Sequence, residues 1–281
     1  MKKILVTGAN GQLGSELSIL SSKYPEYEWI FADRTKITLD NLDLLPIQLN
    51  EIKADVILNC GAYTAVDKAE TEKDLAFTIN SLAVEIIAKY AAKNNIKLIH
   101  ISTDYVFDGN SSSALDEEAL TNPINVYGES KLAGEIVCMK QNPDAIIIRT
   151  SWVYSKFGNN FVKTMQRLMQ EREEISVVND QVGSPTYAAD LAQVMIDIVN
   201  SSNWISGIYN YSNEGEISWH EFALGIKELG GYNCKVNGIP SSSYPTPAKR
   251  PNFSLLDKKK IKVIYNLEVP CYKESLKKIF E

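Results

Sequence analysis

The sequence of 281 residues predicts an α/β fold with a doubly wound parallel sheet, followed by a smaller C-terminal region. In the first half, short apolar runs alternate with helical patterns, which is typical of βαβ units that place helices on both faces of a parallel sheet. After Ser151 this alternation changes. We therefore expect a sheet domain over residues 1–151 and a second region over residues 152–281, with the chain free to return to the sheet later.

The elements are expected in the following order. Strands are predicted where apolar residues run together, at 3–6, 29–32, 55–59, 97–101 and 145–148. Between them, helical spacing of apolar residues or good helix formers predicts helices at 12–21, 81–93 and 127–139. Beyond Ser151 we expect helices at 161–171 and 189–199, a strand at 175–178, and an ordered loop rich in Ser and Pro at 241–251.

Composition excludes several classes of protein. Apolar residues make up 44% and charged residues 23%, which is ordinary for a globular chain, and the net charge of −6 argues against a nucleic-acid binder or a basic membrane-surface protein. No apolar run approaches the roughly 20 residues of a membrane span. The four scattered cysteines form no CxxC pair, so we expect reduced thiols in a cytoplasmic protein. With only His100 and His220, neither a multi-histidine metal site nor a Ser-His-Asp triad is supported.

A glycine-rich turn follows the first predicted strand and opens a helix. Gly8 permits a tight turn, Gly11 allows close approach of a diphosphate, and Gly14 allows the helix to pack on the sheet. This arrangement predicts a Rossmann-type dinucleotide site. Asp33 lies 19 residues after Gly14, a spacing that fits a bond to the adenosine ribose and favours NAD, whereas the adjacent Arg34 suits the 2′-phosphate of NADP. The preference between NADPH and NADH stays open.

A tyrosine and a lysine four residues apart open the helix after the fourth strand. Tyr127 and Lys131 lie on one helix face, and we expect the ammonium to lower the phenol's pKa from about 10 so that it can exchange a proton near neutral pH. Thr103, at the end of the fourth strand, can orient a carbonyl or alcohol oxygen against the phenol. These three residues are the predicted catalytic group.

With these motifs the sequence resembles the extended short-chain dehydrogenase/reductases, which have a Rossmann fold and bind nucleotide sugars in their C-terminal region. Within that superfamily it is most similar to the dTDP-4-dehydrorhamnose reductase family. Cys60 and Gly61 stand where that family usually has alanines. The matching segments span most of the chain, at residues 59–70, 102–109, 149–154, 158–161, 179–186 and 245–251.

The resemblance implies an NAD(P)-binding domain over 1–151, a mainly substrate-binding region over 152–281, and reduction of the 4-keto group of dTDP-4-dehydro-β-L-rhamnose to dTDP-β-L-rhamnose. Tyr127 would donate the proton, Lys131 would hold the nicotinamide ribose, and Thr103, Asp104 and Trp152 would contact the sugar. The family's further cofactor contacts match Gln12, Leu13, Asp33, Asp40, Asn41, Ala62, Tyr63 and Thr64.

The resemblance implies NADPH as the cofactor, with NADH also accepted by many members. Some members are dimers with Mg²⁺, which leaves a homodimer open, but no ligand cluster in this sequence demands a metal. Arg250 can pair with a sugar diphosphate or lie on the surface, and is not assigned to the site.

Two alternatives remain. Another nucleotide-sugar enzyme of the same fold, such as a 4-epimerase or a different 4-ketosugar reductase, would share the glycine turn and the Tyr-Lys pair. A 4,6-dehydratase is disfavoured, because an Asp-Glu pair is expected after the threonine and this chain has Asp104 and Tyr105. The second alternative is a non-catalytic dinucleotide-binding regulatory subunit, like that of methionine adenosyltransferase.

Overall fold

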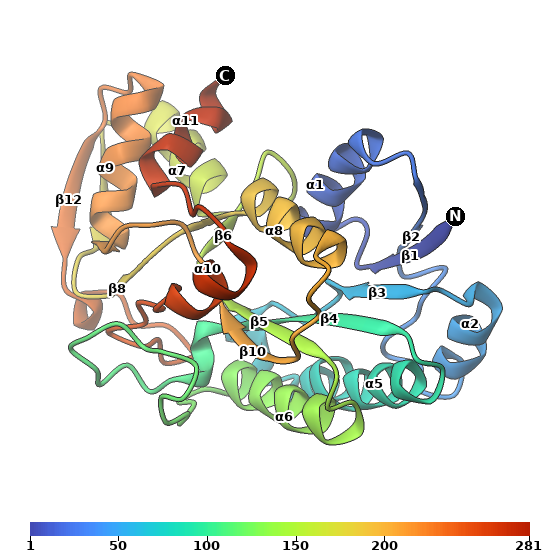
Figure 1. The fold of residues 1–281 in the computed structure, drawn as a ribbon. Coiled ribbons are helices and arrows are strands. Elements are labelled where there is room, and N and C mark those ends of the chain that lie inside the picture. Colours follow the sequence, from blue (N-terminus) through green and yellow to red (C-terminus); the bar gives the residue numbers. More distant parts are fainter.

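The computed structural model describes residues 1–281, and its centre is a six-stranded parallel sheet in the order β10-β5-β4-β3-β1-β2 (Figure 1). Five strands come from the first 151 residues, which confirms the predicted doubly wound α/β fold. The sixth, β10, comes from the C-terminal half and pairs with β5 in parallel. The strands are β1 (Lys2–Thr7), β2 (Tyr27–Ala32), β3 (Val56–Asn59), β4 (Lys97–Thr103), β5 (Ile146–Thr150) and β10 (Gly207–Asn210).

Helices cover both faces of this sheet, because its strands are apolar on both sides. Ile4 and Val6 of β1 join the core formed with α1 and α8, whereas Leu5 between them joins the opposite core, formed with α2 and α5. Figure 1 shows α1 and α8 on one side of the sheet and α2, α5 and α6 on the other. These helices are α1 (Gln12–Leu20), α2 (Leu45–Ile52), α5 (Ala83–Lys93), α6 (Val126–Gln141) and α8 (Ala188–Asn200).

The helix predicted at 81–93 is part of a longer helical stretch. It starts with α4 (Lys73–Phe77), continues through a π-helical turn at Thr78–Leu82 and ends with α5; the short α3 (Val66–Ala69) precedes it. By length and composition alone the stretch Lys73–Lys93 is one helix that could cross a membrane. Here its buried side chains, such as Val84 and Ile87, pack into the core between the sheet and the helices of this face. The prediction that the protein has no membrane partner stays a prediction.

The C-terminal region has a core of its own. The helices α7 (Phe161–Glu171), α9 (Trp219–Gly230) and α11 (Tyr272–Phe280) enclose it with the parallel pair β7 (Glu174–Val178) and β12 (Lys235–Ile239). Two further short pairs are β6 (Val153–Tyr154) with β9 (Thr186–Tyr187) and β8 (Val182–Gly183) with β11 (Ile217–Ser218). Single 3₁₀ turns lie at Ser21–Lys23, Asp104–Val106 and Ser241–Ser243.

Residues after Ser151 divide between the two parts of the molecule. The helix α8, the strand β10 and the helix α10 (Lys259–Tyr265) pack on the sheet, and Ile261 of α10 lies in the same core as Ile4. The remaining elements form the second body, on the left in Figure 1. The chain therefore crosses between the bodies several times, and its loops meet along the carboxyl ends of the strands, where doubly wound folds bind ligands.

Candidate active site

The glycine turn between β1 and α1 has the geometry of a diphosphate-binding turn. Gly8 has a left-handed φ of 66°, and a Cβ there would lie 2.7 Å from the backbone N and Cα of Gly61. A Cβ on Gly14 would lie 2.4 Å from the carbonyl oxygen of Gly8. No side chain caps the N-terminus of α1, so its first N–H groups have no side-chain partner and can bind an anion. The turn therefore fits a dinucleotide.

A buried chain of hydrogen bonds supports this turn from below. The Oγ1 of Thr7 donates to Oδ1 of Asn59 at 2.6 Å and accepts from the backbone N–H of Gly61 at 3.1 Å. The Nδ2 of Asn59 lies 2.9 Å from Nδ1 of His100. Burial lowers the pKa of His100 well below its usual value, so this imidazole is neutral. These hydrogen bonds join the carboxyl ends of β1 and β3 to the middle of β4 and fix the backbone beside Gly8.

Asp33 and Arg34 follow β2 directly. Asp33 Oδ1 accepts hydrogen bonds from Oγ1 and the backbone N–H of Thr35, at 2.6 and 2.9 Å, and these bonds lower the pKa of its carboxyl. Arg34 is exposed. Asp40 and Asn41 are exposed in the segment before α2, where Asn41 Oδ1 accepts from the backbone N–H of Leu44. All four residues thus lie between β2 and α2.

The other predicted cofactor residues differ in how they are placed. The side chain of Leu13 is buried in the core between the sheet and α8. Gln12 joins α1 to the second body: its Nε2 donates to Val153 O at 3.2 Å, and its Oε1 accepts from Asn160 Nδ2 at 2.9 Å. Ala62, Tyr63 and Thr64 follow β3.

Asn80, which sequence reasoning missed, holds the segment at Tyr63. Its side chain accepts from the Tyr63 N–H at 2.9 Å, donates to the Tyr63 carbonyl at 3.0 Å and donates to Ser130 Oγ at 3.0 Å. It lies in the π-helical turn before α5. These contacts join the cofactor side of the site to α6, the helix that carries Tyr127. No local pattern in the sequence indicates this role, because the contacts span 17 and 50 residues.

The helix α6 brings the predicted catalytic residues together. Asn125 caps its N-terminus, with Oδ1 accepting from the Gly128 N–H at 2.8 Å. A Cβ on Gly128 would lie 2.2 Å from the carbonyl oxygen of Tyr105, so the helix begins directly against the turn that follows Thr103. The Tyr127 ring meets the Tyr105 ring edge to face, with centroids 5.5 Å apart. Thr103, Tyr127 and Lys131 thus lie at one site, as the sequence predicted.

The electrostatics of this site differ from the sequence-based expectation. Burial raises the pKa of Tyr127 to about 12, with Asp104 adding to the rise and the Thr103 hydroxyl opposing it. The Nζ of Lys131 donates to the carbonyl oxygen of Ile101 at 2.7 Å, and burial lowers its pKa to about 8. The expectation that Lys131 lowers the phenol's pKa toward neutrality is wrong in this structure, because desolvation of the phenolate outweighs any attraction to the ammonium.

Asp104 and Trp152 are the predicted sugar contacts. Asp104 is buried, which raises its pKa to about 6, and its Oδ1 accepts from Thr103 Oγ1 at 3.1 Å while Oδ2 has no partner. Trp152 has a left-handed φ of 48° and stacks on Trp219, with ring centroids 3.7 Å apart. A Cβ on Gly183 would lie 3.1 Å from the Trp152 ring. The indole is therefore held in one orientation.

Arg250 forms a bidentate ion pair with Asp67 of α3, at 2.8 and 3.1 Å. In the same loop, the carbonyl oxygen of Lys249 accepts from Asn125 Nδ2 at 2.7 Å. The loop at 245–251 thus joins the second body to both α3 and the start of α6.

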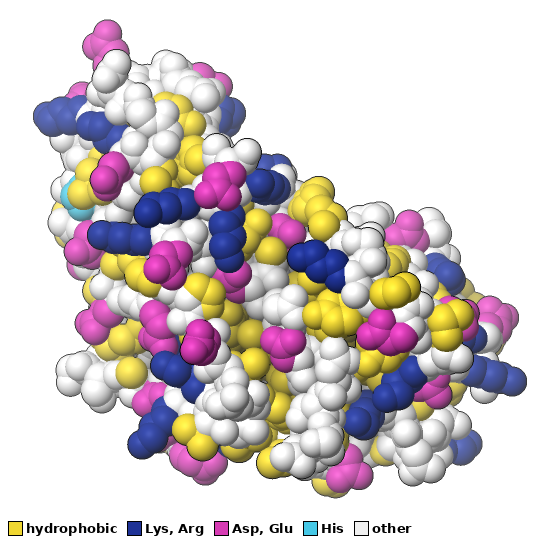
Figure 2. Space-filling model, turned by 45° about the horizontal axis from the view of Figure 1, so that its top comes forward, with side chains coloured by type: hydrophobic (Ala, Val, Ile, Leu, Met, Phe, Trp, Pro, Cys, Tyr) yellow, Lys and Arg dark blue, Asp and Glu magenta, His cyan; other side chains and the backbone are white.

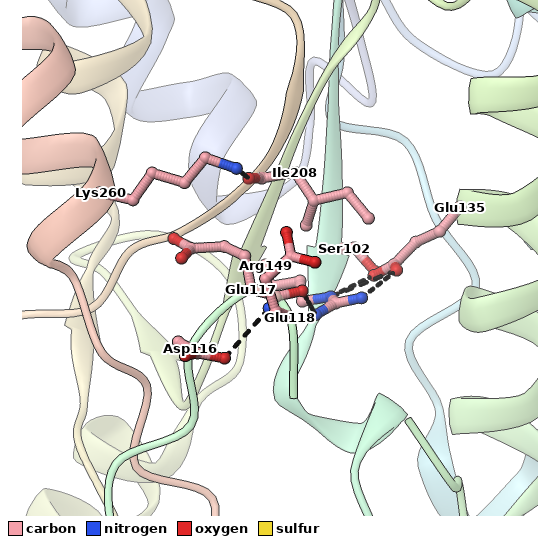
Figure 3. A network of polar contacts seen from close by, with 8 residues as sticks. All are labelled: Ser102, Asp116, Glu117, Glu118, Glu135, Arg149, Ile208 and Lys260. Carbon is pink, nitrogen blue, oxygen red and sulfur yellow. Dashed lines mark hydrogen bonds and ion pairs between the residues drawn. The ribbon is translucent and has the colours of Figure 1, made fainter. Parts of the chain in front are cut away.

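A buried ion pair behind the catalytic residues was also missed. Glu135 of α6 accepts from Arg149 of β5 at 2.7 and 2.9 Å and from Ser102 Oγ at 2.5 Å. Figure 3 shows these side chains converging between α6 and the two strands. The signal in the sequence was the spacing of four residues from Lys131, which places Glu135 on the face of α6 that carries the catalytic pair.

Comparisons with known proteins identify the family to which this chain belongs. A family model described as the RmlD substrate binding domain matches residues 1–281. A dTDP-4-dehydrorhamnose reductase of Aggregatibacter actinomycetemcomitans is 39% identical, over 99% of this chain and 98% of that protein. The chain belongs to the dTDP-4-dehydrorhamnose reductase family.

Solved structures agree with this membership. The dTDP-4-dehydrorhamnose reductase of Bacillus anthracis in complex with NADP is 40% identical, with a TM-score of 0.95 over 100% of this chain and 99% of that one. A UDP-glucose 4-epimerase of Thermus thermophilus in complex with NAD has a TM-score of 0.83 over 99% of this chain and 97% of that one, at 18% identity. The epimerase therefore shares the fold alone.

Proposed function

We propose that this protein reduces the 4-keto group of dTDP-4-dehydro-β-L-rhamnose with NADPH and forms dTDP-β-L-rhamnose. The observation that carries the proposal is that three residues lie at one site, Tyr127 and Lys131 on the first two turns of α6 and Thr103 at the end of β4. Membership of the reductase family along the whole chain supports the substrate.

The glycine turn and the residues after β2 support the proposed binding of the cofactor. The N-terminus of α1 and the glycine turn would hold the diphosphate, and Asp33 and Arg34 would meet the adenosine ribose and its 2′-phosphate. The B. anthracis relative, solved with NADP, supports NADPH as the cofactor. When bound, the nicotinamide supplies the hydride.

The chain's own residues would supply the proton and orient the sugar. The hydroxyls of Thr103 and Tyr127 would bind the ketone oxygen, and the Tyr127 phenol would transfer its proton as that oxygen becomes an alkoxide. With a pKa of about 12 the phenol is protonated at neutral pH, and it can give its proton to the alkoxide because an alkoxide is a stronger base than a phenolate. Lys131 would hold the ribose, and Asp104 and Trp152 would bind the sugar.

The competing functions make different demands on the site. A dehydratase would need a carboxylate beside Asp104, and the residue there is Tyr105. Burial raises the pKa of the Tyr105 phenol above its ordinary value of about 10, so the phenol stays protonated and cannot act as the base in water elimination. An epimerase would return its cofactor unchanged after each cycle, and a regulatory subunit would bind nucleotide without turnover.

The test is a panel of dTDP-, UDP- and GDP-linked 4-ketosugars, each assayed with NADPH and NADH by the loss of nicotinamide absorbance. We expect oxidation equal to the sugar reduced, fastest with dTDP-4-dehydro-β-L-rhamnose and NADPH. Faster reduction of another sugar would indicate a different 4-ketosugar reductase. Epimerised product without net oxidation would indicate an epimerase, and binding without turnover a regulatory subunit.

We also propose that the enzyme works in the cytoplasm. All four cysteines are free thiols, as expected in a reducing compartment. A homodimer, the absence of a resident metal and the absence of a nucleic-acid partner stay predictions.

A further inference from the structure

We propose that Glu135, held by Arg149 and Ser102, is a positioning residue that fixes α6 against β4 and sets a negative charge one helical turn from the Lys131 ammonium. The proposal rests on the proposed function, since Lys131 is assigned its role there. Glu135 itself touches neither substrate nor cofactor in this assignment, and it acts through Lys131.

The geometry that carries the proposal is a match between one helix face and one strand end. Tyr127, Lys131 and Glu135 follow one another at intervals of four residues on α6. They meet three consecutive residues of β4. The Thr103 hydroxyl is close enough to the Tyr127 phenol to oppose the rise in its pKa. The Ile101 carbonyl oxygen accepts a hydrogen bond from Lys131 Nζ at 2.7 Å, and Ser102 Oγ donates one to Glu135 at 2.5 Å. A shift of α6 along β4 would break all three pairings together.

The ion pair that holds Glu135 is almost completely buried. The side chains of Arg149 and Glu135 are 3% and 2% exposed, and Ser102 and Arg149 are directly paired in the register of β4 and β5. The guanidinium also lies over the Phe107 ring, 5.2 Å from its centroid. Its Nη1 donates to the Glu117 carbonyl oxygen at 3.4 Å (Figure 3). Buried ion pairs are often no more stable than packed apolar residues. Stability alone therefore gives little reason for a charge at position 135.

Glu135 lies four residues after Lys131 on the same face of α6, and it is the one carboxylate among the groups that influence the Lys131 ammonium. The ionisable groups that act on Lys131 or are acted on by it are Glu135 and Cys138 of α6, Cys60 after β3, and His100 of β4. Burial raises the pKa of both thiols and lowers that of His100, so these three groups are neutral. Burial lowers the pKa of Lys131 to about 8, and Glu135 is the largest influence in the opposite direction.

The direct test is the ionisation of Lys131 in Glu135→Gln. Lysine labelled with ¹³C at Cε would be followed by NMR against pH, with the signal assigned by its loss in Lys131→Met. The ammonium exists below the pKa, so removal of the Glu135 carboxylate lowers that pKa, and we expect a fall of about one unit. Glu129→Gln, an exposed carboxylate on the same helix that pairs with Lys73, is the matched control and should leave the titration unchanged.

The activity gives a second readout. If turnover needs the ammonium, it declines as pH rises through the pKa of Lys131. In Glu135→Gln this decline should begin about one unit lower than in the wild type, with kcat affected more than the KM for the sugar. A purely structural role for Glu135 would lower activity equally at all pH values and leave the Lys131 titration unmoved, which would overturn the proposal.

Glu135→Gln leaves Arg149 buried without its partner, and that variant can fail to fold. The double variant Glu135→Leu/Arg149→Met removes both charges and fills the same buried space with apolar side chains, so it should fold. It should show the same lowered Lys131 titration, and a wild-type titration in the folded double variant would refute the proposal. The NMR measurement needs no substrate. A wild-type enzyme that reduced none of the sugars would therefore count against the proposed function and leave the inference on Lys131 to be decided separately.

Discussion

At the scale of single residues, Tyr127 is the proposed proton donor, and burial raises the pKa of its phenol. The phenol is therefore protonated at neutral pH, and the Thr103 hydroxyl opposes the rise in its pKa. Tyr127→Phe keeps the ring that packs against Tyr105 and removes only the acid. We expect turnover to fall by roughly 10²–10⁴-fold, the usual contribution of general acid catalysis. NADPH binding, measured by fluorescence titration, should be nearly unchanged; near-normal turnover would show that another group supplies the proton.

Arg34 tests the cofactor preference at the same scale. Its side chain is exposed directly after β2, beside Asp33. Arg34→Ala would remove a charge-assisted hydrogen bond to the 2′-phosphate of NADPH. The affinity for NADPH should therefore fall roughly tenfold or more, and the affinity for NADH should hardly change. Lys36→Ala, an exposed cation two residues along the same turn, is the control. Equal losses for both cofactors in calorimetric titration would exclude a contact between Arg34 and the 2′-phosphate.

At the scale of elements, close packing of α6 on the π-helical turn at Thr78–Leu82 shapes the site. A Cβ on Gly134 would lie only 2.0 Å from the carbonyl oxygen of Asn80. Gly134→Ala should therefore displace the turn that holds Tyr63 and cost about 1–3 kcal/mol of unfolding free energy, as overpacking usually does. Gly225→Ala is the control in α9, because its Cβ would lie 3.6 Å from Leu276. Thermal denaturation should show a lower Tm for Gly134→Ala alone; equal Tm values would contradict this account of the packing.

The same scale shows what the sequence could predict. The strands β1 to β5 were found because apolar runs mark strands buried on both faces. The strand β10 was not predicted, because Gly207–Asn210 has only four residues, with Gly and Asn at its ends, and its place in the sheet depends on pairing with the distant β5. The helix α2 was missed, although Pro46 at its first turn was a start signal. The helix α9 was missed as well, although Ser218 and Glu221 form a capping box.

Some residues of the candidate site could likewise be predicted from the sequence, and others could not. Local spacing predicted the glycine turn and the pair Tyr127 and Lys131, because a turn and one helix face are each encoded within a few residues. The contacts of Asn80 and Glu135 depend on which helix packs on which strand, and spacing along the chain does not fix that. The pKa of Tyr127 likewise follows from burial, which only the assembled fold determines.

At the scale of the whole molecule, the loop at 245–251 joins the second body to α3 and to the start of α6. Arg250 and Asp67 connect the two parts, and the Arg250 hydrogen bond is the largest influence that lowers the pKa of the Asp67 carboxyl. That carboxylate also accepts from the backbone N–H of Ala248 at 3.2 Å. The ion pair is partly exposed, so its contribution to global stability is about 1 kcal/mol or less. Its effect should therefore appear in the position of the loop.

Asp67→Asn removes the charge and keeps the size of the side chain, so it tests whether this loop shapes the sugar site. We expect a KM for the dTDP-sugar about fivefold higher, equivalent to about 1 kcal/mol, because the loop must be ordered on binding. NADPH affinity and Tm should change little. Glu171→Gln, which breaks the exposed pair with Arg167 on α7, is the matched control and should leave the KM unchanged. If Asp67→Asn weakened the binding of NADPH as much as the binding of the sugar, the loop would support the whole sheet domain. The substrate-specific role argued for the loop would then be wrong.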